Sequence, residues 1–245
     1  MVLVMFDVDG TLTESSALDA VTFIDALREV FGFRDVSDDW SVYKHVTSAG
    51  VVREIVRTRL SRLPTDGEAD RMQVRFNELL RAQVEKTGVR PIPGAAEALA
   101  RLTRSSDEYA VALASGNWRE TVRFMLAAVG LSIAGLPGAF SDDDFTREGI
   151  CRASRQRAEE RHGGPLPTVV CVGDGVWDVR TSQALGYGFV GIGCGPGAAK
   201  LRAAGAVEVL PDFEDVETFL AAVRRAAATV PSASSPSAGT AASAR

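Results

Sequence analysis

Short apolar runs alternate with longer amphipathic stretches along most of the chain. Five apolar runs predict β-strands, at residues 2–6, 109–114, 168–172, 188–192 and 206–210. Most of these runs are continuously apolar, which is typical of strands buried on both faces. Apolar residues at helical spacing predict helices at roughly 94–105, 117–130, 147–162, 176–186 and 213–227. Strands that alternate with helices predict an α/β fold with a parallel sheet covered on both faces.

The segment 15–88 departs from this alternation because it contains helical patterns and no convincing strand. We expect its helices at about 17–31, 50–63 and 67–87. Since this stretch is too long for a single connection, we interpret it as an inserted α-helical cap on a core formed by residues 1–14 and 89–228. The glycine-rich stretch 191–197 is interpreted as a turn after a strand. Residues 229–245, rich in Ser and Ala, are expected to be a disordered tail.

Composition and charge narrow the classes of function. The chain has 245 residues, of which 46% are hydrophobic and 24% charged, so we expect a folded core. The net charge of −5 argues against a nucleic-acid partner, which usually binds a basic patch. No apolar run is long enough for a membrane span and the N-terminus does not resemble a signal peptide, so we expect a cytoplasmic protein without a membrane partner. Three scattered cysteines are interpreted as reduced thiols, and the oligomeric state is left open.

Chemically active side chains follow three of the predicted strands. Asp7 and Asp9 come directly after the first strand, the segment 115–117 (SGN) follows the second, and Asp174 and Asp178 follow the third. Ligands of open parallel sheets bind outside the carboxyl ends of the strands. Four carboxylates gathered there would repel one another, and a divalent cation with oxygen ligands, Mg²⁺, resolves that repulsion. A hydroxyl and free amides before a helix suit a phosphate.

These motifs together resemble those of the haloacid dehalogenase superfamily. The matching segments are residues 7–13 (DVDGTLT), 115–117 (SGN) and 173–178 (GDGVWD), in the family's order. Within that superfamily, the phosphoglycolate-phosphatase-like group with an inserted helical cap is most similar. The resemblance covers the core and the cap, and it implies a Rossmann-like core and a Mg²⁺-dependent phosphatase that acts on a small phosphorylated metabolite.

The resemblance also implies roles for individual carboxylates. Asp7 is the nucleophile that forms an aspartyl-phosphate, and Asp9 is the general acid and then the general base. Mg²⁺ is held by the Asp7 carboxylate, the Asp9 backbone carbonyl and Asp174. Asp178 is implied to hold the metal ligands in place or to contact the metal through a water molecule.

A phosphate cradle and a cation complete the implied site. The phosphoryl oxygens are implied to be held by Ser115, Gly116 and Asn117. The family's usual lysine is missing here, because the chain has no lysine between Lys86 and Lys200. We expect Arg147 to replace it, with Arg152 and Arg155 as alternatives.

Substrate choice and reaction type stay open at this point. In capped phosphatases the cap sets specificity, so we expect His45 and Thr47, between two cap helices, to contact substrate. The alternatives are a phosphomutase of the beta-phosphoglucomutase type, a 2-haloacid dehalogenase and a phospho-accepting binding module. Asp9 argues against dehalogenation, which needs no acid at that position. The cap and the last motif argue against a phospho-accepting module.

Overall fold

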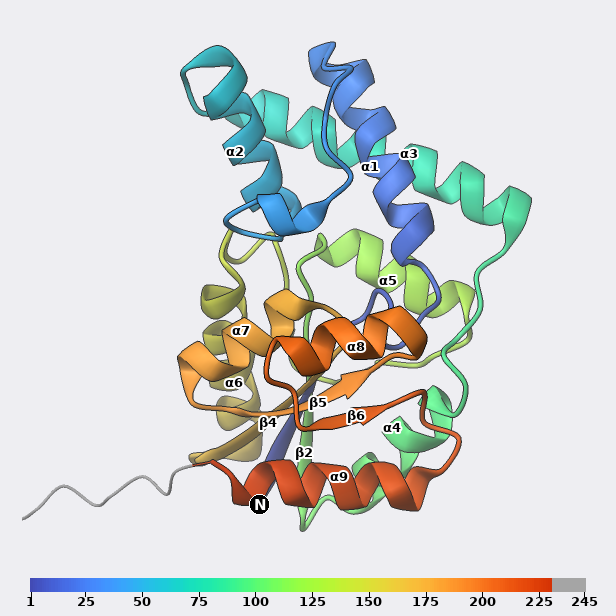
Figure 1. Ribbon diagram of the computed structural model, residues 1–245, viewed down its shortest axis with the longest axis vertical. Helices are drawn as coiled ribbons and strands as arrows, with labels where there is room; N and C mark the ends of the chain where they lie inside the picture. The colour runs from blue at the N-terminus through green and yellow to red at the C-terminus, as the bar shows by residue number, and fades with distance from the viewer. Residues whose placement is uncertain (231–245) are drawn as a thin grey trace, which may run out of the picture.

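The computed structural model describes residues 1–230 and contains one six-stranded parallel sheet (Figure 1). The strands lie in the order β3-β2-β1-β4-β5-β6. Their bounds are β1 Val2–Phe6, β2 Tyr109–Ala114, β3 Gly138–Ala139, β4 Thr168–Gly173, β5 Gly188–Ile192 and β6 Glu208–Leu210. The central strand β1 pairs with β2 on one side and β4 on the other. The predicted α/β fold is confirmed.

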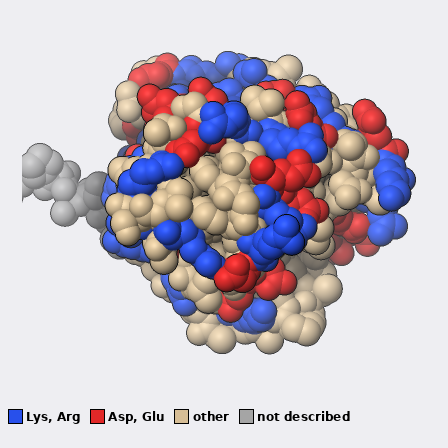
Figure 2. All heavy atoms as spheres, turned by 90° about the horizontal axis from the view of Figure 1, so that it is seen from above, with Lys and Arg blue, Asp and Glu red and all other residues tan. Residues whose placement is uncertain are grey.

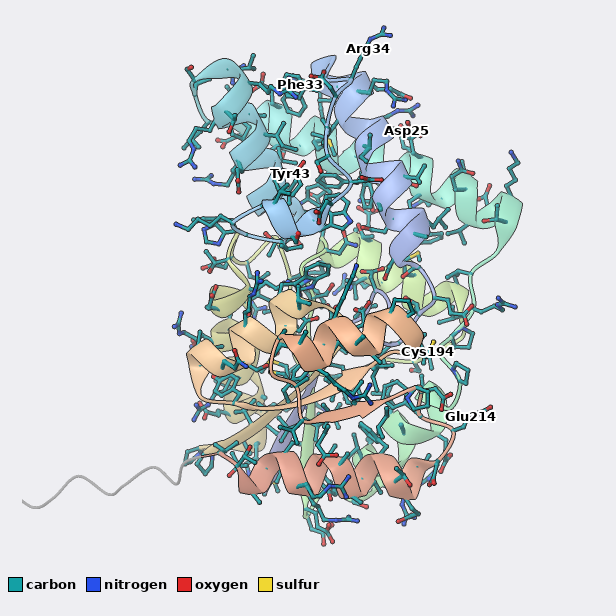
Figure 3. The ribbon with its side chains drawn as sticks, in the orientation of Figure 1. Asp25, Phe33, Arg34, Tyr43, Cys194 and Glu214 are labelled. Atoms are coloured by element: carbon teal, nitrogen blue, oxygen red, sulfur yellow. The ribbon has the colours of Figure 1, made fainter. Side chains whose placement is uncertain are left out.

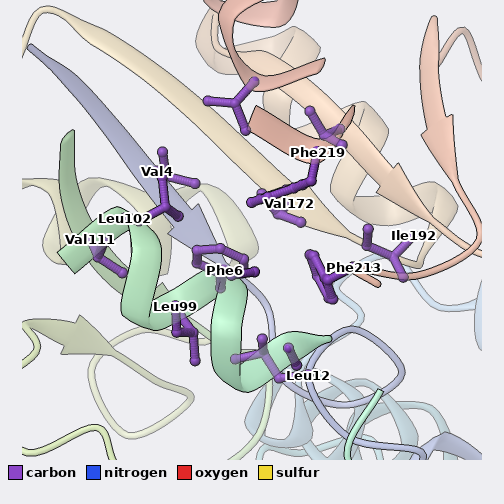
Figure 4. Packing of buried hydrophobic residues seen from close by; sticks show 14 of the residues in the cluster. Val4, Phe6, Leu12, Leu99, Leu102, Val111, Val172, Ile192, Phe213 and Phe219 are labelled. Atoms are coloured by element: carbon purple, nitrogen blue, oxygen red, sulfur yellow. The ribbon is translucent and has the colours of Figure 1, made fainter. Parts of the chain in front are cut away.

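Helices cover both faces of this sheet. The core helices are α4 Ala95–Arg104, α5 Arg119–Ala128, α6 Arg147–His162, α7 Val176–Leu185, α8 Gly195–Ala203 and α9 Val216–Ala228. Val4 and Phe6 of β1 pack in one apolar cluster with residues of α4, α5 and α9, whereas Leu3 and Met5 pack on the opposite face against α6. Figure 4 shows Phe6 beside Phe213 and Phe219, with ring centroids 6.1 Å away in each case. Burial on both faces explains why β1 is apolar at every position.

Two elements differ from the sequence prediction. Strand β3 was not predicted, because two residues at the sheet edge leave no apolar run. The interpretation of residues 191–197 as a turn is wrong, because only Gly193 and Cys194 separate β5 from α8. Gly195 and Gly197 weaken the helical pattern of α8, but Pro196 suits a first helical turn, and Ala198 and Leu201 bury the helix against the core.

The helical cap lies above the carboxyl ends of the strands (Figure 1). It contains α1 Ser16–Phe31, a short 3₁₀ turn η1 Trp40–Val42, α2 Ser48–Leu60 and α3 Asp66–Thr87. Helix α3 begins with a capping box, in which Thr65 and Glu68 satisfy each other's backbone amides. The cap has an apolar cluster of its own, centred on residues such as Phe23, Phe76 and Leu80. The exact residues at which core gives way to cap, predicted at 14/15 and 88/89, stay a prediction.

Several contacts connect the cap to the core, among them one between the connecting segments and one made by Trp118. The two connecting segments run side by side, since the Glu14 amide donates to the Arg90 carbonyl at 2.8 Å. Trp118, at the start of α5, enters the cap's cluster and stacks on Phe23 with centroids 6.1 Å apart. The cap is therefore seated directly over the end of β2.

The surface and the ends of the described chain show few further features. Seen from the cap side, basic and acidic side chains are interspersed (Figure 2). None of the helices within residues 1–230 is long and apolar enough to cross a membrane. The predicted tail lies outside the described residues from position 231 onward.

Candidate active site

The carboxyl ends of the three central strands bring the sequence motifs together. In the register of the sheet, Phe6 lies opposite Leu113 of β2 and Val172 of β4. Asp7 is the next residue of β1's chain, so the segments that carry Ser115 and Asp174 leave the sheet beside it. All three residues line one cavity of about 120 Å³ beneath the cap. The structure thus brings residues of all three motifs together at the carboxyl ends of the central strands.

The turn after β1 depends on a glycine. Gly10 has φ +80°, and a Cβ at this position would lie 2.1 Å from Asp174 Oδ2. The amides of Thr11, Leu12 and Thr13 all donate to the Val8 carbonyl, which closes the turn. The missing side chain thus lets the loops after β1 and β4 touch, and it brings their carboxylates into one site.

Three carboxylates, two of them buried and one half-buried, form an acidic cluster in the described chain. Oxygens of Asp7, Asp174 and Asp178 all lie within 4.8 Å of one another. Burial is the main cause that raises the pKa of each of them, and the charges of the neighbouring carboxylates raise the values of Asp7 and Asp174 further. The Asp174 pKa rises to about 7. Repulsion of this kind is relieved when a cation is bound.

Arg147 is the cation that faces this cluster. Its Nη1 donates to Asp178 Oδ1 at 2.5 Å and lies 3.7 Å from Asp7 Oδ1, while its Nε donates to the Val46 carbonyl in the cap at 2.8 Å. The side chain is only 13% exposed. Of the three arginines considered as replacements for a lysine, Arg147 alone lines the cavity. Arg155 pairs with Glu159 instead, and Arg152 is exposed.

The donor set fits a divalent metal ion bound by oxygen. Asp178 has both oxygens engaged, one by Arg147 and the other by the Gly175 amide at 3.0 Å. Asp174 accepts only a long bond from the Thr11 hydroxyl, at 3.3 Å, and Asp7 faces the cavity. Asp7 and Asp174 are therefore the carboxylates available to an ion, and Asp178 positions Arg147. The surplus of buried negative charge over the single arginine is the observation that supports a cation here.

Asp9 points away from this cluster. Its Oδ1 accepts from the Ser15 hydroxyl at 2.6 Å, and its Oδ2 accepts from Asn117 Nδ2 at 2.9 Å. The Asn117 amide group also donates to Asp19 Oδ1 at 2.6 Å and accepts from the Ser48 hydroxyl at 2.8 Å. One side chain thus joins Asp9 of the core to α1 and α2 of the cap.

The segment after β2 lies at the mouth of the site. The Asn117 amide N–H donates to Ser115 Oγ at 3.1 Å, so it is not free for a ligand. The Gly116 carbonyl accepts from the Ser48 amide of the cap at 2.7 Å. A Cβ on Gly116 would lie 2.9 Å from Arg147 Nη2, so this glycine leaves room for the guanidinium. Ser115 and Gly116 remain suited to hold a phosphoryl group, while Asn117 acts through its side chain.

The cap residues predicted to contact substrate lie in different places. Thr47 lines the cavity, but its hydroxyl caps α2 and donates to the Phe145 carbonyl at 2.7 Å. His45 packs edge-on against the Phe145 ring and lines a neighbouring cavity instead. The sequence analysis did not single out Asp19 or Trp40, which line the site. The position of Asp19, in the first cap turn after the Asp7 motif, was the available signal.

We expect the metal-free protein to lose stability as the pH rises through neutrality. The Asp174 pKa is about 7 in the folded chain and ~3.9 when unfolded. The stabilising contribution is therefore fully present below about pH 4 and is lost as the pH rises through about 7. Mg²⁺ should oppose this loss, because it binds the deprotonated carboxylates. Thermal unfolding with EDTA and with Mg²⁺ across this range measures both effects.

The matched variant for that experiment is Asp174→Asn. It should flatten the profile in EDTA and reduce the stabilisation by Mg²⁺. A wild-type protein whose unfolding temperature does not respond to Mg²⁺ at any pH would contradict the assignment.

Comparison with known proteins identifies relatives at the level of fold and family. A family model for haloacid dehalogenase-like hydrolases matches residues 1–186. A comparison with curated proteins finds no match. A hydrolase from Pseudomonas syringae is similar in structure, with 22% identity and a TM-score of 0.67, over 90% of this chain and 98% of that one.

Two further solved structures carry more specific descriptions. A predicted phosphoglycolate phosphatase from Haemophilus somnus 129pt is 17% identical, with a TM-score of 0.58, over 89% of this chain and 97% of that one. A protein from Bacteroides vulgatus described as a candidate beta-phosphoglucomutase is 17% identical, with a TM-score of 0.65, over 93% of this chain and 90% of that one. At these identities the likeness concerns the fold. Since the family model covers well over half of the 245 residues, the chain belongs to the haloacid dehalogenase-like hydrolases.

Proposed function

We propose that the protein is a Mg²⁺-dependent phosphatase that hydrolyses a small phosphorylated metabolite through an aspartyl-phosphate on Asp7. The observation that carries the proposal is the pairing of two carboxylates with different surroundings. Asp7 faces Arg147 and the acidic cluster, whereas Asp9 is turned toward Ser15 and Asn117. Two carboxylates held in this way suit two roles, nucleophile and proton carrier.

In the first step an Asp7 oxygen attacks the phosphorus atom and the bond to the leaving oxygen breaks. Asp9 gives its proton to that oxygen, so the product leaves as an alcohol. Ser115 and the Gly116 amide bind phosphoryl oxygens, and Arg147 neutralises charge on the phosphoryl group as it moves. Ser15 and Asn117 hold the Asp9 carboxyl in place.

In the second step a water attacks the phosphorus atom of the aspartyl-phosphate. Asp9 now takes a proton from that water, and the bond between phosphorus and the Asp7 oxygen breaks. Inorganic phosphate and the free Asp7 carboxylate result, so the site returns to its starting state.

The metal would be held by Asp7, Asp174 and the Asp9 backbone carbonyl. When bound, Mg²⁺ supplies positive charge that offsets the charge of the carboxylates and the phosphoryl oxygens. Asp178 keeps Arg147 directed toward Asp7, because its two oxygens are engaged by Arg147 and by the Gly175 amide. We also place the protein in the cytoplasm, on the basis of its free cysteines Cys151, Cys171 and Cys194.

A phosphomutase is the second candidate, because solved structures similar to this chain include one described as a candidate beta-phosphoglucomutase. The cavity of about 120 Å³ is small beside the ~300–1,000 Å³ of typical ligand pockets, so it favours a short phosphate ester over a hexose phosphate. The two functions are distinguished by their products. A phosphatase releases inorganic phosphate, whereas a mutase returns an isomeric phosphate ester.

The direct test is hydrolysis of p-nitrophenyl phosphate and short alkyl phosphates, with Mg²⁺ and with EDTA. We expect inorganic phosphate to be released only with the metal. Release that is unaffected by EDTA, or no release from any ester, would count against the proposal.

We expect Asp9→Asn to accumulate the aspartyl-phosphate. With p-nitrophenyl phosphate the leaving group needs little help from an acid, so the first step survives, whereas attack by water loses its base. Steady-state turnover should fall ~10²–10⁴-fold after an initial burst of p-nitrophenol. Rapid-mixing absorbance and intact-protein mass spectrometry measure the burst and the phosphorylated chain. A uniform slowing without a burst would contradict the role of Asp9 in the second step.

A further inference from the structure

We propose that the substrate's leaving group is a small amino alcohol whose ammonium group is bound by Asp19 and by the ring of Trp40. This inference rests on the proposed phosphatase function and adds the chemical class of the substrate. Its basis is the acidic and aromatic side chains that the cap contributes to the cavity wall.

Asp19 is an acidic group of the cavity that the proposed chemistry does not use. It lies in the first turns of α1, and its Oδ1 accepts from Asn117 Nδ2 at 2.6 Å. The same amide nitrogen donates to Asp9 Oδ2 at 2.9 Å. Two carboxylates thus share one neutral donor, and no ion pair of Asp19 is present within residues 1–230. Burial and the charge of Asp9 raise the pKa of Asp19, because its charged form has no positive partner, and a bound cation would supply one.

The rest of the wall supplies no counter-charge for an anionic leaving group. Among the described residues that line the cavity, Arg147 is the only cation, and it is engaged by Asp178 and lies beside Asp7. A carboxylate on the leaving group would meet Asp9 and Asp19 without a positive partner. The cavity thus disfavours esters such as 2-phosphoglycolate and favours neutral or cationic ones.

An aromatic ring of the cap favours a cationic leaving group over a neutral one. Trp40 lines the cavity and is partly exposed, and the buried Phe23 holds its ring edge to face, with centroids 5.6 Å apart. Aromatic rings attract ammonium groups, and tryptophan does so most strongly. The other tryptophan of the cavity wall, Trp177, has the Arg147 guanidinium 5.6 Å from its ring centroid. Trp40 is therefore the tryptophan available to a substrate cation.

The size of the cavity favours a short leaving group. The cavity volume of about 120 Å³ lies below the ~300–1,000 Å³ of typical ligand pockets. That volume accommodates a phosphoryl group and a chain of a few atoms. A two-carbon amino alcohol is the smallest that carries an ammonium group beyond the reacting oxygen.

The experiment compares three esters of similar size and different charge. These are 2-aminoethyl phosphate, n-propyl phosphate and 2-phosphoglycolate, whose leaving groups are cationic, neutral and anionic. We expect kcat/KM to fall in that order, with a difference of about 10- to 100-fold between the first two. Phosphocholine and 3,3-dimethylbutyl phosphate form a second pair, equal in shape and different in charge.

The variant Asp19→Asn tests the contact itself. Asparagine keeps a carbonyl oxygen that accepts from Asn117 and removes the charge. We expect the advantage of 2-aminoethyl phosphate over n-propyl phosphate to disappear, through a rise in KM for 2-aminoethyl phosphate. Asp25→Asn is the matched control, because Asp25 lies on the same helix, pairs with Arg28 at the surface and is labelled in Figure 3.

The outcomes separate this inference from the function on which it rests. No hydrolysis of any ester, p-nitrophenyl phosphate included, would overturn both. Hydrolysis of p-nitrophenyl and n-propyl phosphate without a preference for the cationic ester overturns the inference alone. An equal fall in kcat for all three esters in Asp19→Asn overturns it too, because Asp19 would then act only by positioning Asn117 and Asp9.

Discussion

Replacing the buried Asp7 by asparagine should abolish phosphatase activity and leave the fold intact. An amide in place of the carboxylate is a poor nucleophile and a weaker ligand for Mg²⁺, so kcat/KM for p-nitrophenyl phosphate should fall by at least ~10⁴-fold. The free energy of unfolding should not fall in EDTA. Asp7 belongs to a cluster of three carboxylates that face one arginine, and removing its charge reduces their repulsion.

The combination of lost activity and retained stability is the informative result. Phosphate release and urea-induced unfolding, measured on the same preparation, provide both quantities. Asp107→Asn is a suitable control, because Asp107 is exposed just before β2, at the opposite end of the strand from the site. Residual activity near that of the control would show that Asp7 is not the nucleophile.

The main elements of the fold were predictable because their apolar patterns are strong. β1 and β4 are buried on both faces, and the segment 16–87 contains helical periodicity without a strand, so the sheet and the cap both follow from the sequence. The two-residue β3 and the glycine-rich start of α8 lack such patterns. They are ordered by contacts with the rest of the core, which a local reading of the sequence does not contain.

The candidate site was predictable where it depends on the ends of neighbouring strands. The residues Asp7, Ser115 and Asp174 meet because parallel strands place their carboxyl ends at one edge. The cap wall was not predictable in the same way. Asp19 reaches the site through a bond to Asn117, which lies 98 residues away along the chain, and that contact depends on how the cap is seated.

The second large effect is expected at Arg147, where we predict a loss of both activity and stability. Arg147→Met removes the only cation that the described residues place beside Asp7 and Asp178, and leaves two buried carboxylates without a positively charged partner. The free energy of unfolding should fall by ~3–5 kcal/mol in EDTA. The value of kcat/KM should fall ~10²–10³-fold, because charge on the phosphoryl group is no longer neutralised.

Two further variants give this prediction its specificity. Arg147→Lys keeps the charge but cannot reproduce both the Nε bond to the Val46 carbonyl and the Nη1 bond to Asp178, so its activity and stability should lie between those of wild type and Arg147→Met. Arg155→Met is the control on the same helix, where a 31% exposed side chain pairs with Glu159 and a cost of at most ~1 kcal/mol is expected. If Arg155→Met reduced kcat/KM as much as Arg147→Met, the assignment of Arg147 in place of the family's lysine would be wrong. If Arg147→Lys instead matched wild type in both measurements, the bond to the cap would contribute nothing, and a point charge beside Asp7 would be sufficient.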